Sequence, residues 1–70
     1  MLELDLRLVP FIEQQFSNLP PDEVEAYEEL LEKEDWQIYD WLRGVGAPNN
    51  GRLELIVEKI IAFSLATSKI

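Results

Sequence analysis

The chain has 70 residues with no cysteine and no histidine, and its fourteen acidic and six basic side chains give a formal net charge of −8 at pH 7. This composition excludes disulfides, zinc sites built from cysteine and histidine, thiolate nucleophiles and imidazole bases. The negative charge also disfavours nucleic acid and anionic membrane surfaces as partners, and the length predicts a single domain with a small core.

The opening stretch, MLELDLRLVP, alternates apolar and polar side chains, which is the pattern of a half-buried strand. No other segment is a credible partner strand, and an isolated strand is not stable. At helical spacing the same stretch places Leu4, Leu8 and Phe11 on a broad apolar arc, so we predict a helix over about residues 2–17. Pro10 removes one backbone hydrogen bond and is expected to kink this helix.

Two acids of this segment have different surroundings on the predicted helix. Glu3 lies on a polar stripe, where Arg7 stands four residues later at the spacing of a helical ion pair. Asp5 points into the middle of the apolar arc, where an unpaired buried carboxylate would cost several kcal/mol. We therefore expect Asp5 to be solvated, to satisfy free N–H groups of the first turn, or to contact a partner. The width of the arc suggests that two neighbours cover the helix.

The remaining chain predicts three more helices, over about residues 21–33, 36–44 and 51–66. Two prolines open the second, which is rich in acids. Asp35 is the expected N-cap of the third helix, which can stop at Gly44 or Gly46, and Asn50 is the expected N-cap of the fourth. The predicted fold class is all-α, a small antiparallel bundle of four helices.

Two features that resemble binding sites are better explained as ordinary structure. The segment GAPNNGRL approaches the phosphate-loop pattern, but Arg52 stands where lysine is required and Leu53 replaces the magnesium-binding hydroxyl, so we predict a turn. Pairs of carboxylates on the acidic helix, such as Glu25 with Glu28, could clasp a hard cation. They do not follow a calcium-loop pattern, so a solvated face is the favoured interpretation.

The aromatic and hydroxyl side chains give no strong sign of catalysis. Trp36, Tyr39 and Trp41 could stack on a ring cofactor, but in a small bundle such a cluster is more often core, with Trp36 expected to be the most exposed. The serine and threonine hydroxyls have no base in the sequence to activate them. We expect no enzyme, no metal and no stably bound cofactor.

Several short motifs stand in a fixed order along the chain: MLELD at 1–5, PF at 10–11 with Glu13, LLE at 30–32, the acidic pair Glu34 and Asp35, WL at 41–42, Gly46, Pro48, LE at 53–54 and Val57. Over about residues 1–63 this set resembles the succinate dehydrogenase assembly factor family. The resemblance implies a small helical bundle with one further N-terminal helix. It also implies a protein that promotes covalent attachment of FAD to the flavoprotein subunit of succinate dehydrogenase or fumarate reductase.

The signature of that family is Arg-Gly-x-x-Glu, and here Glu3 matches its glutamate while Met1 and Leu2 fill the two variable places. The Arg and Gly would stand immediately before Met1. The expectation is a longer natural chain that this sequence enters at an internal methionine, the alternative being a variant with half the motif. The resemblance implies that Glu3 is the main partner-binding residue and that Asp5 and Met1 frame it.

A second hypothesis is a generic acidic adaptor that grips a basic protein through residues 22–35, and a metal-using enzyme is a distant third. No apolar run approaches the roughly 20 residues of a membrane span, and the N-terminus lacks the basic region of a signal peptide. We therefore expect a soluble, cytoplasmic and monomeric protein.

Overall fold

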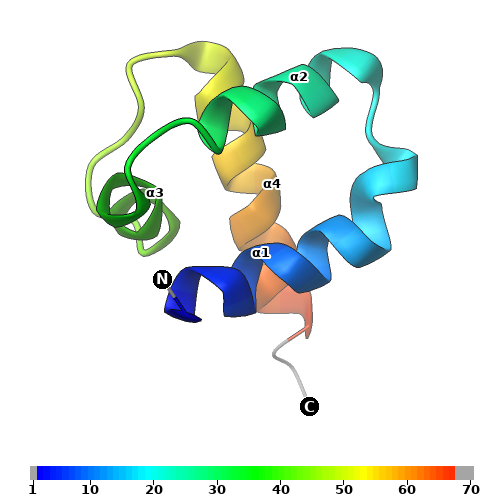
Figure 1. Ribbon diagram of the computed structural model, residues 1–70, viewed down its shortest axis with the longest axis horizontal. Helices are drawn as coiled ribbons and strands as arrows, with labels where there is room; N and C mark the ends of the chain where they lie inside the picture. The colour runs from blue at the N-terminus through cyan, green and yellow to red at the C-terminus, as the bar shows by residue number, and fades with distance from the viewer. Residues whose placement is uncertain (1, 68–70) are drawn as a thin grey trace.

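The computed structural model describes residues 2–67, which form four α-helices and one short 3-10 helix and contain no strand. In chain order these are α1 (Leu2–Gln15), η1 (Phe16–Asn18), α2 (Pro21–Leu30), α3 (Asp35–Leu42) and α4 (Gly51–Thr67). In Figure 1, α4 runs down the middle of the molecule, with α2 at its upper end, α1 across its lower end and α3 to one side. The predicted all-α fold of four helices is confirmed.

The hydrophobic core lies where α4 meets the other three helices, each of which it contacts. Phe11 is only 1% exposed, and its ring centroid lies 6.0 Å from that of Tyr27 and 5.6 Å, edge-on, from that of Phe63. No charged side chain is buried within residues 2–67. The other buried side chains of the core are Leu4, Leu8, Ala26, Leu30, Ile38, Leu42, Leu53, Ile56, Val57 and Ile60.

The first two helices both end in turns whose hydrogen bonds span three residues instead of four. α1 continues through Pro10 to Gln15 and passes into the 3-10 turn that ends at Asn18. α2 ends at Leu30, three residues before the predicted end, although the acidic pattern continues. After Leu30, the N–H groups of Glu32 and Lys33 donate to carbonyls only three residues back, at 3.1 and 3.0 Å. These bonds make a closing turn in place of a further turn of α-helix.

The third helix starts one residue earlier than predicted, at the expected cap itself. Asp35 is the first helical residue, so the prediction that it is the N-cap is wrong, and Glu34 occupies that position in extended backbone. The Glu34 N–H donates to Oε1 of Gln37 at 3.4 Å. Gln37 is the third residue of the helix, so its side chain reaches back to the N-cap as in a capping box. Gly44, with φ of +83°, ends α3, and the next N–H reaches the carbonyl of Asp40 at 2.8 Å.

The buried Tyr27 ring makes the stability of this fold sensitive to alkaline pH. Burial raises the pKa of the Tyr27 phenol above its ordinary value of about 10. The unfolded chain therefore loses this proton first. The contribution of Tyr27 to the free energy of unfolding is fully present below about pH 10 and is lost as the pH rises through the raised pKa.

We expect the free energy of unfolding, measured by urea titration, to fall between pH 8 and pH 11 more steeply in the wild type than in Tyr27→Phe. The phenylalanine variant keeps the ring but has no phenolic proton to lose. In both proteins the lysines lose their positive charge at high pH, so the repulsion among the acidic side chains grows equally in the two. Equal slopes in the two proteins would contradict this role of Tyr27.

Candidate docking surface

Glu3 lies on the exposed side of α1, at the edge of a surface cleft of about 500 Å³. Arg7 and Pro10 of the same helix line the cleft, and Tyr39 of α3 and Phe63 of α4 line it from the other helices. The expected ion pair between Glu3 and Arg7 is not formed between these two described residues. The Glu3 carboxylate therefore stands in solvent beside a partly apolar hollow, where it can accept hydrogen bonds from another molecule.

The structure separates Asp5, another predicted partner-binding residue, from this cleft. Asp5 is exposed, so of the alternatives expected for it the structure shows a solvated carboxylate. Because a helix turns about 100° per residue, two residues place Asp5 on a different flank of α1 from Glu3. Met1 lies outside the described residues.

Asp5 is exposed because only one side of the apolar arc of α1 is covered. α3 and α4 pack on the side that carries Leu4 and Leu8, so two neighbours contact α1 as expected, but they leave the other part of the arc exposed. Leu2 is 71% exposed, Leu6 68% and Val9 49%. Sequence reasoning missed the exposure of these side chains, for which the unusual width of the arc was the available signal.

The acidic helix α2 divides its carboxylates between an internal and an external role. Glu23 forms an ion pair with Lys59, and Glu29 pairs with Arg52 at 2.8 Å, so two acids of α2 hold the two basic residues of α4 that lie in the described chain. Three further glutamates of this part of the chain are exposed: Glu25, Glu28 and Glu32. In residues 2–67 no group of three or more acids is placed to hold a metal ion.

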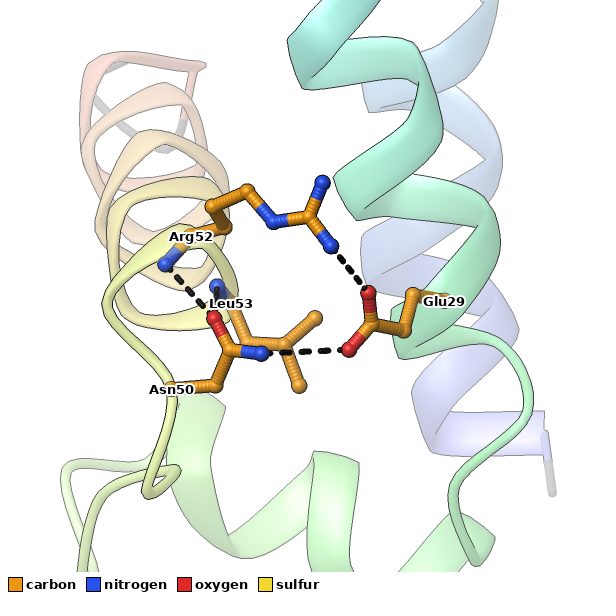
Figure 2. A network of polar contacts seen from close by, with 4 residues as sticks. All are labelled: Glu29, Asn50, Arg52 and Leu53. Carbon is orange, nitrogen blue, oxygen red and sulfur yellow. Dashed lines mark hydrogen bonds and ion pairs between the residues drawn. The ribbon is translucent and has the colours of Figure 1, made fainter.

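The segment that resembles a phosphate loop is a helix cap, as Figure 2 shows. Oδ1 of Asn50 accepts the N–H groups of Arg52 at 2.8 Å and Leu53 at 3.4 Å, so Asn50 caps α4 as predicted. Its Nδ2 donates to Glu29 at 3.2 Å, and the Arg52 guanidinium donates to the other oxygen of the same carboxylate at 2.8 Å. Arg52 therefore connects α4 to α2, and the interpretation of this segment as a turn is confirmed.

The aromatic side chains follow the predicted order of exposure. Trp36 is 60% exposed, whereas Tyr39 and Trp41 are partly buried and pack against the core. The guanidinium of Arg43 lies over the Tyr39 ring at 4.9 Å, so this ring already has a cationic neighbour beside the cleft. In the described part of the chain, no helix is long and apolar enough to cross a bilayer.

These features define a small all-α protein with acidic and apolar side chains displayed around a surface cleft. A family model described as Sdh5, flavinator of succinate dehydrogenase, matches residues 1–64. The chain belongs to this family.

Curated relatives extend over most of the chain. It is 38% identical over 66 residues to the FAD assembly factor SdhE of Vibrio cholerae, a match that covers 94% of this chain and 77% of the relative. The FAD assembly factor SdhE of Coxiella burnetii is 40% identical over 64 residues, covering 91% of this chain and 78% of the relative. That of Photobacterium profundum is 36% identical over 64 residues, covering 91% and 73%. No solved structure matches the chain.

Proposed function

We propose that this protein is an FAD assembly factor that binds the flavoprotein subunit of succinate dehydrogenase and promotes covalent attachment of its FAD. The observation that carries the proposal is the match of residues 1–64 to a family described as flavinator of succinate dehydrogenase. The relatives named FAD assembly factor SdhE support it, since they align with more than nine-tenths of this chain.

In this proposal the protein acts by binding and is not the catalyst. The proposal places the flavin attachment site on the partner, and this chain contains no histidine or cysteine. Glu3 is exposed at the edge of the cleft, where its carboxylate can accept charge-assisted hydrogen bonds from a basic or backbone donor of the flavoprotein. Asp5 and Met1 are assigned to the rim of the contact.

The proposal has four finer parts. The protein is taken to hold no FAD of its own, to act as a monomer in the cytoplasm, to leave membranes and nucleic acids unbound, and to accept fumarate reductase as a second flavoprotein partner. The net charge of −8 supports the part that concerns membranes and nucleic acids, because it repels their phosphate groups.

The test is flavin attachment in a bacterial strain that lacks its own assembly factor. Co-expression of this chain with the succinate dehydrogenase flavoprotein subunit is expected to raise the covalent flavin fluorescence of that subunit in a denaturing gel. Glu3→Ala is expected to lower the gain about tenfold or more, because each hydrogen bond to a charged group contributes about 1.5–3 kcal/mol. Each protein is also tested with Arg-Gly added before Met1, to measure what the full family signature contributes.

Glu25→Ala is the matched control, because Glu25 is an exposed glutamate on a different helix. It is expected to keep the wild-type gain. The absence of any gain, with or without the added Arg-Gly, would refute the proposed function. An unchanged gain in Glu3→Ala would refute the role of Glu3.

The generic acidic adaptor remains the alternative, and the exposed glutamates within residues 22–35 are the observation that favours it. If that hypothesis holds, reversing the charges of Glu25, Glu28 and Glu32 abolishes partner binding while Glu3→Ala does not. The assembly-factor proposal predicts the opposite order of effects.

A further inference from the structure

α1 carries a second apolar face on which no other helix of residues 2–67 packs. Leu2, Leu6 and Val9 recur at i, i+4 and i+7, a spacing that brings side chains onto one side of a helix. We call these three residues the α1 stripe. Their exposed fractions of 71%, 68% and 49% contrast with those of the buried side of α1, where Leu4 and Leu8 are 4% and 6% exposed.

Three carboxylates surround the α1 stripe. At 100° per residue, Glu3 flanks it on one side and Asp5 on the other, while Glu13 continues its line one turn beyond Val9. All three acids are exposed. The ion pairs among the described residues are formed by other acids, namely Glu23, Glu29 and Asp40, so the charges around the stripe are not neutralised by these internal contacts.

The α1 stripe is continuous with the cleft beside Glu3. Leu6 belongs to both, since it also lines the cleft together with Pro10 and Phe63. A volume of about 500 Å³ lies within the range of cavities that hold small ligands, so the cleft has room for a large side chain. An apolar residue that approaches along the stripe can therefore insert next to Leu6.

The charge of this surface selects among the molecules that could cover it. A second copy of the chain would set Glu3, Asp5 and Glu13 against the same three acids, and like charges in an interface are costly. An anionic bilayer would be repelled for the same reason. A protein segment whose apolar side chains are bordered by lysine or arginine satisfies both the stripe and its carboxylates.

We propose that the α1 stripe and the cleft beside Leu6 bind a segment of the flavoprotein partner that presents apolar side chains flanked by basic residues. This inference rests on the proposed function and extends the contact from Glu3 to a continuous surface. The apolar part provides affinity through buried area, and the three acids steer and orient the basic segment.

The test is direct binding of the full chain to the purified FAD-free flavoprotein subunit, measured by isothermal titration calorimetry. The double substitution Leu6→Ser and Val9→Ser is expected to weaken the affinity about tenfold or more, since a few central apolar contacts carry most of the binding energy of an interface. Both side chains are exposed, so circular dichroism should show an unchanged fold. Leu55→Ser is the control, because Leu55 is 67% exposed, like Leu6, but lies on α4 outside the stripe. It should stay within about twofold of the wild type.

A charge variant tests the basic character of the segment. Raising NaCl from about 0.1 to about 1 M shortens the Debye length from about 10 Å to about 3 Å and is expected to weaken wild-type binding. Asp5→Asn combined with Glu13→Gln should bind more weakly at low salt and lose affinity less steeply as salt rises. An equal salt dependence in this variant and the wild type would overturn the assignment of a basic segment.

The outcomes separate this inference from the function on which it rests. If the wild type neither binds the flavoprotein nor raises covalent flavin, the proposed function fails and the inference fails with it. If the wild type does both and the Leu6→Ser, Val9→Ser protein does so equally well, the stripe is not part of the contact and the function stands. A wild-type dimer in sedimentation equilibrium, or binding to phosphatidylglycerol vesicles, that is lost in the same variant would assign the stripe to that occupant and overturn the inference.

Discussion

Replacing Phe11 with alanine is expected to lower the free energy of unfolding by about 3–5 kcal/mol. The ring is only 1% exposed and lies between the rings of Tyr27 and Phe63, at centroid distances of 6.0 and 5.6 Å. Truncation removes its buried surface and both aromatic contacts, and leaves a cavity where α1, α2 and α4 meet. A chain of 70 residues has only about 4–10 kcal/mol in all, so this loss is a large part of its stability.

Urea unfolding followed by tryptophan fluorescence and circular dichroism measures this loss. Phe16→Ala is the control, since the same side chain five residues later is 49% exposed, and it should cost much less. Phe11→Leu keeps most of the buried volume and gives a folded protein to measure if the alanine variant does not fold. A change below about 0.5 kcal/mol in Phe11→Ala, the range of ordinary surface substitutions, would contradict the central place of this ring.

Replacing Asn50 with alanine is expected to cost about 1–2 kcal/mol. The side chain caps α4 by accepting the N–H groups of Arg52 and Leu53, and loss of such a cap costs about 0.5–2 kcal/mol. The same amide also donates to Glu29 at 3.2 Å, so the substitution also weakens the attachment of α2 to the start of α4. Because Glu29 keeps its bond to Arg52 and is partly exposed, this second contribution is the smaller one.

Thermal and urea unfolding of three variants separates these contributions. Asn49→Ala, at the exposed neighbouring position, should be close to the wild type. Asn50→Asp keeps an oxygen for the cap but replaces the donor to Glu29 with a second carboxylate, so it should fall between wild type and Asn50→Ala. If Asn49→Ala and Asn50→Ala are equally unstable, the cap has no special role.

The sequence was sufficient to predict the elements whose signals are local. The alternation in MLELDLRLVP indicated a strand, yet helical spacing placed Leu4, Leu8 and Phe11 on one side, and these are the residues of α1 that are buried. Asn50 was predicted as a cap from its place before a periodic apolar segment. The third helix is the local exception, because Glu34 and Asp35 are both acidic and only the backbone conformation determines which of them precedes the helix.

Features that depend on how helices cross were not predictable from local pattern. Glu29 contacts Asn50 and Arg52, which follow it by 21 and 23 positions, and Glu23 contacts Lys59, which follows it by 36. These pairs exist only because α2 lies against α4. Local pattern showed that the apolar arc of α1 is wide, but not that the chain would cover only one side of it. The exposure of Leu6 and of Asp5 follows from that packing, and with it the shape of the surface around Glu3.

The central position of α4 also determines when the protein can fold during its synthesis. α4 is the last helix of the described chain, yet it contacts α1, α2 and α3, and it supplies Leu53, Ile56, Val57 and Ile60 to the core. While a ribosome is still making this segment, the first three helices lack the one helix that all of them contact. The nascent chain therefore stays open until α4 has left the exit tunnel, and the domain then closes as one unit.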